Sequence, residues 1–333
     1  TMDIYKIYAN MNTTASEIQQ TARPTAILSN LSGVDASTAA DQVQGILQQF
    51  HMLEDGSTTA ADASMHIVDV LDKVSGSVGI DYAKGIKIIS DAVQASGQVA
   101  YDAGMSYEQL AAITAKVSER TREDGSSIGN ALKTIITRTT KVGKMPQYAD
   151  EVDNAALSNA SASLHAIGVD VYNPDGSDRG IITVMSELKD KWDDLTDAQQ
   201  AKISYDVAAT RQTSKFKSML DAFTDSMSLA EEATTANGNA EANQEKYMES
   251  TAGKLQAIKT QMQDFWVNFY NSGTVNGVLE FVHSLTEGFT SLEKTLGPIP
   301  ALLTAVFAAM TVKNATMAGL KFLSGGGLAT VVG

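Results

Sequence analysis

The chain has 333 residues, with 25 lysines and arginines against 39 aspartates and glutamates, a formal net charge of −14 and no cysteine. The absence of cysteine excludes disulfides, thiol nucleophiles and cysteine-based metal sites, and the acidic balance disfavours a nucleic-acid-binding surface along the whole chain, because phosphate contacts need clustered lysine and arginine. Aromatic residues make up 6% and prolines number five, a composition that favours helices with small interfaces.

The two ends of the sequence carry little targeting information. The first residues lack a basic region followed by a long apolar core, so no secretory signal is predicted. The last residues stop inside an apolar segment, and we expect a fragment of a longer protein.

The first hundred residues predict a series of short helices. Residues 1–24 form a helix or linker that Pro24 closes or kinks. Asp35 and Asp81 are suited to cap the helices that follow them. Apolar residues recur there at helical spacing: Val43, Ile46, Leu47 and Phe50; Met65, Val68, Leu71 and Val74; Ile86, Ile89 and Val93.

Residues 102–142 predict a helical hairpin. Gly104 suits the left-handed residue that closes one helix, and Ser106 with Gln109 forms a capping box that opens the next. A polar break then ends at Gly125, which tolerates positive φ, and Ser126 can cap the second helix. The expected buried faces hold Leu110, Ile113 and Val117 on the first helix, and Ile128, Leu132, Ile135, Ile136 and Thr139 on the second.

Residues 167–176 are the one segment without a helical pattern. Their alternation predicts a short extended piece or small hairpin. The acidic turn around Asp175 invites comparison with a calcium loop, but Val171 and Ile182 occupy positions that need carboxylates. A plain polar turn is the favoured interpretation.

A further helix begins at a second capping box, Thr196 with Gln199. Trp192 and Leu195 precede it, and we expect them to pack back on the new helix. Arg211 lies farther along, and we interpret it as donating a hydrogen bond to a neighbouring helix end rather than binding a ligand.

From residue 241 the apolar residues recur in heptads, which predicts seams that need partner helices. The pattern leaves self-association and intramolecular packing equally open. The residues predicted to self-associate are Met248, Leu255, Ile258, Met262, Phe265, Phe269, Val278, Val282, Leu285, Phe289 and Leu292.

Three groups of motifs resemble phage tail tape-measure proteins. The first is Ala103–Ser106 with Leu110, Thr121 and Arg122 with Gly125, and Gly129–Ile135. The second is Gly168–Val171, Asp175, Gly176, Arg179, Glu187, Leu188, Lys191, Trp192, Leu195, Thr196, Ala198–Ala201, Ala208, Arg211 and Gln212. The third is Glu245–Met248, Ser250, Gly253–Leu255, Phe265 and Trp266.

The resemblance implies a structural protein of the virion. Such a protein occupies the lumen of the tail tube, governs tail length and assembly, and leaves ahead of the DNA during ejection. It is assembled in the bacterial cytoplasm as a trimer or hexamer of itself. The implied partners are the tail tube protein, distal tail or baseplate proteins, tail assembly chaperones and the host membrane, with no sequence-specific nucleic acid.

No catalytic chemistry is predicted. The four histidines, His51, His66, His165 and His283, lie far apart, and none is spaced from another as a metal ligand. No phosphate-binding loop, dinucleotide fingerprint or nucleophile motif is present. We therefore expect no enzyme activity and no catalytic, cofactor or metal residues.

The predicted fold is all-α. A compact multi-helix domain with one small extended segment precedes longer coiled-coil-like helices and an apolar helical segment. The expected divisions are 1–24 (N-terminal helix or linker), 25–236 (helical core domain), 237–297 (heptad helices) and 298–333 (apolar segment). The expected core contacts are Leu110, Ile113, Leu132, Ile135, Trp192 and Leu195.

The apolar run in residues 299–323 supports a rival hypothesis, a membrane-active helical effector or pore-forming protein. Lys313 interrupts this run, and the uninterrupted part is shorter than a bilayer span. It is either a buried helix or the start of a region that reaches the host membrane.

Overall fold

The computed structural model describes residues 15–54, 56, 58–148, 154–250 and 253, and most of these residues are helical. The all-α prediction is confirmed. The α-helices are α2 (Ala15–Ser32), α3 (Ala36–Gln49), α4 (Ala60–Gly76), α5 (Tyr82–Asp102), α6 (Tyr107–Thr121), α7 (Gly125–Thr139), α8 (Asn154–His165), α9 (Ile181–Trp192), α10 (Asp197–Asp221), α11 (Phe223–Thr234) and α12 (Asn239–Glu249). Two 3-10 turns, η1 (Lys141–Lys144) and η2 (Pro146–Tyr148), follow α7.

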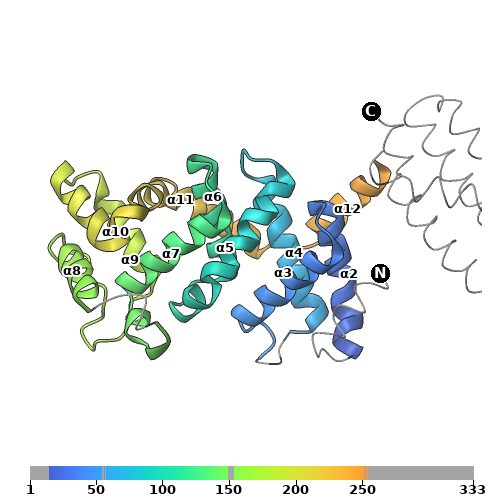
Figure 1. Cartoon of the computed structure of the whole chain (residues 1–333), viewed down its shortest axis with the longest axis horizontal. Helices are drawn as coiled ribbons and strands as arrows, with labels where there is room; N and C mark the ends of the chain where they lie inside the picture. The colour runs from blue at the N-terminus through green and yellow to red at the C-terminus, as the bar shows by residue number, and fades with distance from the viewer. Residues whose placement is uncertain (1–14, 55, 57, 149–153, 251–252, 254–333) are drawn as a thin grey trace, which may run out of the picture. The chain divides into compact units, whose positions relative to one another are not determined.

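The chain divides into two units, residues 1–244 and 245–333. In the first unit, α3 packs on α2 and α5, α5 packs on α7, and α7 packs on α8 and α10 (Figure 1). Apolar faces of all these helices meet in one continuous core. In the second unit only α12 beyond residue 244, Ser250 and Gly253 are described, so the heptad helices and the apolar segment lie outside the described residues.

Local sequence signals start most of these helices. Asp35 and Asp81 accept hydrogen bonds from the first-turn amides of α3 and α5. The capping boxes predicted at Ser106 and Thr196 are both present. Gly104 takes the positive φ expected of it, 75°. Pro24, however, does not end a helix; it lies inside α2.

The break between α6 and α7 differs from the prediction. Arg122, not Gly125, is the left-handed residue, with φ 59°. Asp124, not Ser126, caps α7 by accepting from the Ser127 amide at 2.9 Å. Gly125 is instead the first, buried residue of α7.

Gly125 and Gly129 lie four residues apart on α7, so they share the face that packs against α5. A Cβ placed on Gly125 would lie 2.0 Å from the carbonyl oxygen of Ile88. One placed on Gly129 would lie 2.7 Å from the carbonyl oxygen of Ala92. Glycine is required here because the two helix backbones touch, not because of its backbone freedom.

The predicted extended segment is a single antiparallel bridge between Tyr172 and Asp178. The turn between them is closed by Asp175, whose carboxylate accepts from the amide and hydroxyl of Ser177 at 2.8 and 2.7 Å. The segment contacts the start of η1, just past the end of α7, because Asp178 also accepts from the Lys141 amide at 2.9 Å.

Helix α10 is kinked at Ala209, whose φ of 56° and ψ of 171° fall in a region that side-chain-bearing residues rarely adopt. We expect Ala209→Gly to raise the free energy of unfolding by about 1 kcal/mol, because relief of the strain exceeds the entropic cost of glycine. Urea titration followed by circular dichroism measures this. A loss of stability would show that the kink is not strained.

Candidate interaction site

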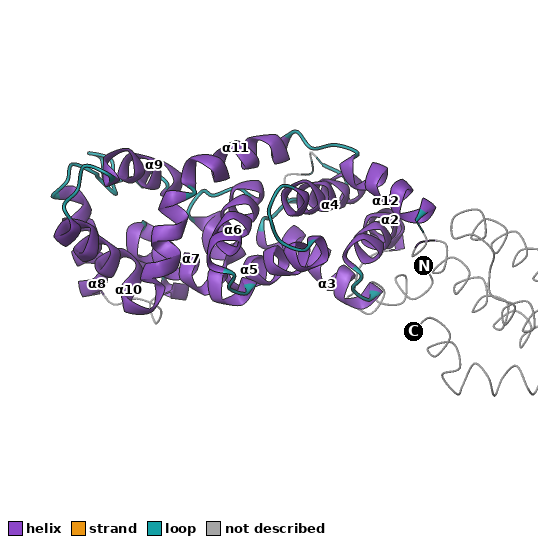
Figure 2. Cartoon of the chain, turned by 90° about the horizontal axis from the view of Figure 1, so that it is seen from above, coloured by secondary structure: helices purple, strands orange, loops and turns teal. Residues whose placement is uncertain are grey.

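The most distinctive feature of the first unit is the segment of residues 223–243, which we call the strap. It holds α11 and the first turns of α12. After α10 the strap runs back across α6 to α4, as Figure 2 shows, and so returns the chain toward the helices with which it began. Its apolar contacts are modest: Phe223, Leu229, Ala230 and Ala233 are buried.

The strap is anchored at its far end by two carboxylates of α4. Asp69 is 1% exposed and accepts from the amides of Gly238 at 3.0 Å and Ala240 at 2.8 Å. Asp72 accepts from the side-chain amide of Asn243 at 2.8 Å and from the Tyr82 hydroxyl. Asp69 thus satisfies backbone donors at the start of α12, the role of an N-cap, but from another helix.

Burial raises the pKa of Asp69, while the hydrogen bonds from Ala240 and Gly238 act in the opposite direction. Burial and the contact with Asp72 also raise the pKa of the Tyr82 phenol. Because the pKa of Asp69 is higher in the folded state, ionisation of this carboxyl lowers the stability as the pH rises above 3.8, the ordinary value for aspartate. The two backbone hydrogen bonds reduce this cost.

Ion pairs on the surface add to the anchor, by which we mean the hydrogen bonds that join Asp69 and Asp72 to the strap. Lys73 of α4 lies 2.9 Å from Glu232, and Arg23 of α2 lies 2.6 Å from Glu241. Arg23 and Glu241 are 74% and 40% exposed, so solvent screens their attraction. Buried hydrogen bonds therefore dominate this end of the strap.

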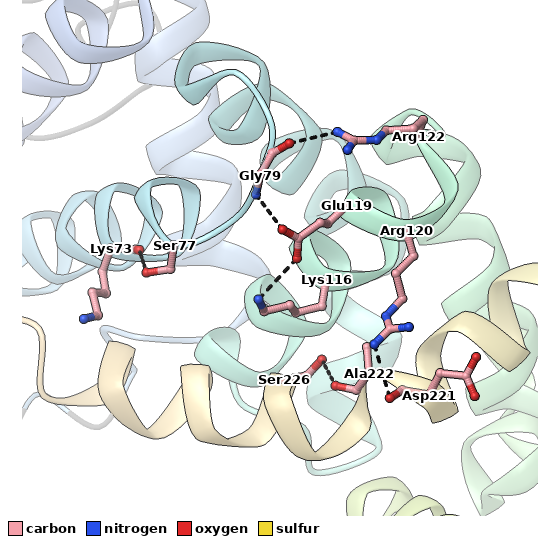
Figure 3. Close-up of polar contacts among 10 residues, drawn as sticks. All are labelled: Lys73, Ser77, Gly79, Lys116, Glu119, Arg120, Arg122, Asp221, Ala222 and Ser226. Atoms are coloured by element: carbon pink, nitrogen blue, oxygen red, sulfur yellow. Dashed lines mark hydrogen bonds and ion pairs between the residues drawn. The ribbon is translucent and has the colours of Figure 1, made fainter.

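The near end of the strap, α11, packs on α6. Just before the strap, Arg120 of α6 reaches the carbonyl oxygen of Asp221, the last residue of α10, with a long contact of 3.5 Å (Figure 3). Beside it, Glu119 accepts from the Gly79 amide at 2.6 Å and Arg122 donates to the Gly79 carbonyl at 2.9 Å. The left-handed backbone of Arg122 thus ends α6 where its side chain can hold the α4–α5 loop.

Glu123 and Lys215 join the α6–α7 break to α10 at 2.7 Å. Burial acts to raise the pKa of Glu123, but hydrogen bonds from Lys215 and Ser127 outweigh it and the pKa is lowered from 4.5. A lowered folded-state pKa contributes stability above the unfolded value, and this contribution disappears as the pH falls through the folded value.

We therefore expect Glu123→Gln to be less stable than the wild type at neutral pH, with a difference that shrinks below about pH 4. Urea titrations at several pH values measure it. Glu231→Gln is the control, because Glu231 is exposed and has no polar partner in the described part of the chain. A difference at Glu123 that does not change with pH would contradict the assignment.

The structure places the predicted core residues as follows. Leu110, Ile113, Leu132, Ile135 and Trp192 are buried, and Leu195 is partly buried against the same core. The Trp192 ring meets Phe216 edge-on at 5.9 Å between centroids. Ile203 and Val207 belong to the same core, and both lie on α10, the helix on which we expected Trp192 and Leu195 to pack.

Of the predicted self-association residues, Met248 alone falls within the described residues, where it is 42% exposed on α12. The others lie outside the described residues: Leu255, Ile258, Met262, Phe265, Phe269, Val278, Val282, Leu285, Phe289 and Leu292.

The interpretation of Arg211 is wrong. Its side chain is exposed and has no hydrogen-bond partner among the described residues. Arg138 of α7 has the role instead, because its guanidinium donates to the carbonyl oxygen of Asp206 at 3.1 Å, just before the kink in α10. No local pattern indicates this contact, because Arg138 and Asp206 lie 68 residues apart in the chain.

No metal or membrane site emerges from the described residues. His51, His66 and His165 each contact one carboxylate, and no group of three or more ligating side chains is placed around a common point in the described ranges. None of the helices within these ranges combines the length and apolar character needed to cross a bilayer.

The sequence was compared with the models of known protein families. The model of the phage-related minor tail protein family matches residues 2–208. The chain belongs to this family. It is a component of the phage tail, and the family's role is structural. No solved structure matches the chain significantly.

The family match ends at Ala208, directly before the kink at Ala209. This phage-related minor tail protein therefore continues past the matched region with the second half of α10, the strap and α12. The anchor joins the two parts, because Asp69 and Asp72 lie inside the matched region and Gly238, Ala240 and Asn243 lie outside it.

Proposed function

We propose that this chain is a section of a tail tape-measure protein. The observation that carries the proposal is the family match over residues 2–208, which places the chain in the phage tail. The resemblance of sequence motifs to tape-measure proteins continues beyond residue 208, as far as Trp266. It supports the tape measure as the specific role within the tail. In this role the protein occupies the tail tube lumen, governs tail length and leaves before the DNA.

The folded unit is an organising section, and the ruler lies in the heptad region that follows. Added residues lengthen a helix by about 1.5 Å each only where the helix is continuous. In the first unit the helices fold back on one another and the strap reverses the chain direction. Residues added there do not convert into length.

The partners proposed on this basis are other copies of the chain, the tube protein, distal tail proteins and assembly chaperones, with membrane contact during ejection. Self-association is tested by light scattering on the full chain and on a truncation that lacks residues 251–333. A trimer or hexamer that becomes a monomer on truncation supports the seams as the assembly surface. A monomer in both cases contradicts it.

The structural role in the tail is tested with a nonsense codon early in the gene. A tape measure is required for tails of defined length, so electron micrographs should show heads without tails or tails of scattered length. Suppression of the nonsense codon should restore a single length. Tails of normal, uniform length without the chain would overturn the proposal.

A further inference from the structure

The corner between α10 and the strap is a single residue, Ala222, which Figure 3 shows beside Arg120. Its φ of −97° and ψ of 3° lie in the bridge region, next to the helical one. Helical hydrogen bonds continue on both sides of it. The Ala222 amide donates to the Ser218 carbonyl at 3.1 Å, and the Ala222 carbonyl accepts from the Ser226 amide at 2.8 Å. The corner therefore interrupts the helical hydrogen bonding only locally.

The sequence around this corner has the character of a helix interior. Residues 197–237 contain no glycine and no proline, and the corner itself is alanine, the residue with the highest helix propensity. The helices from α3 to α7, and α10, begin with a side-chain cap, but α11 begins without one. Contacts from outside the segment must therefore impose the corner.

The apolar face also passes through the corner without a change of phase. Phe216, Leu220, Phe223, Met227 and Ala230 follow one another at intervals of four, three, four and three residues, the spacing of one face of a continuous helix. Met227 is partly buried and the others are buried. Two separate helices that meet at a corner have no need to keep this phase.

Contacts with other helices hold the bend. Helix α11 packs on α6 and α4, where its Leu229 is 5% exposed, and the anchor at Asp69 holds the chain that follows. At the corner itself, the contact from Arg120 to the Asp221 carbonyl is long, at 3.5 Å, and adds little. Once the strap loses its contacts, only the helical preference of the segment remains.

We infer that the strap is a latch. When α11 leaves α4 and α6, residues 210–235 form one straight helix, about 39 Å long at 1.5 Å per residue. Release of the strap therefore lengthens the chain without unfolding its helices. The latch is a property of the first unit and does not depend on the tape-measure role.

The test measures one distance across the corner in the full chain, by pulsed electron paramagnetic resonance. The chain has no cysteine, so Arg211→Cys and Glu231→Cys create two unique sites for spin labels. Both residues are exposed, and they lie on opposite sides of Ala222. A straight helix separates them by about 30 Å along its axis, at 1.5 Å per residue, and the bend brings them closer.

Two variants release the strap from opposite sides. Leu229→Glu places a charge in the buried face of α11 but keeps a good helix former. Asp69→Ala removes the acceptor on α4. Each removes a contact that only the bent form makes, so each should raise the population at about 30 Å at least about tenfold. Ser228→Glu is the matched control, because Ser228 is exposed on the same helix, and the distance should not change.

The shape of the distance distribution decides the inference. A narrow peak at about 30 Å, with unchanged helical circular dichroism, supports the latch. A broad distribution at shorter distances would overturn it, because α11 would then detach as a flexible segment. An unchanged distance in both Leu229→Glu and Asp69→Ala would also overturn it. So would a long distance that is found only in a dimer, since the strap would then belong to a second copy.

Discussion

Gly125→Ala is expected to lower the free energy of unfolding by roughly 3 kcal/mol, the upper end of the cost of overpacking. The added methyl would lie 2.0 Å from the Ile88 carbonyl oxygen and 2.8 Å from the Asp91 Cβ. Neither can yield as a flexible side-chain tip would, so α7 must move away from α5. Urea unfolding of the wild type and the variant measures the loss.

Gly45→Ala is the matched control, because Gly45 also lies inside a helix but a Cβ there meets nothing within 4 Å. It should raise the free energy of unfolding by about 0.5 kcal/mol through higher helix propensity. If both variants change stability equally, the contact between α5 and α7 is not as close as described.

Asp69→Ala is expected to cost about 3 kcal/mol, because it leaves the buried Ala240 amide and the partly buried Gly238 amide without an acceptor. The Ala240 residue is fully buried, so water cannot replace the lost carboxylate there without local opening. The loss should be greatest in the strap. Hydrogen exchange of the Gly238 and Ala240 amides should accelerate more than exchange of the α5 and α7 amides.

Lys73→Ala is the control for this result, since Lys73 is on the same helix and contacts the same strap through Glu232. Its ion pair with Glu232 is partly exposed and worth less than about 1 kcal/mol. Equal protection of the strap in Asp69→Ala and wild type would show that apolar packing, not the carboxylate, holds it.

Much of this fold could be predicted from sequence because its signals are local. The capping boxes at Ser106 and Thr196, the cap at Asp35 and the closing glycine at Gly104 act within one helical turn. The apolar faces repeat with the helical period and are buried where the period predicts. These patterns need no knowledge of which helix packs on which.

The features that were missed depend on pairs of distant segments. The anchor joins Asp69 to Ala240, 171 residues later, and no local pattern specifies that pairing. One signal was available: Asp69 lies within an apolar run of α4, with Ile67 and Val68 before it and Val70 and Leu71 after it, all of them buried. A carboxylate on such a face needs a buried partner, although the partner itself cannot be read from the sequence.

The role of Gly125 was also missed, because it depends on a second helix. Its place in a polar break favoured a turn, but the structure uses it for close packing against the α5 backbone. Its four-residue spacing from Gly129 was the available signal, because small residues at that spacing let helix backbones approach.

The most direct test of the tape-measure proposal is tail length after an in-frame duplication of residues 255–268, two heptads of the predicted seam. A continuous helix in the ruler region predicts tails longer by about 21 Å, at 1.5 Å per residue. Electron micrographs of purified particles measure this against the wild type. Assembled tails that contain the longer chain but keep the original length would contradict the account.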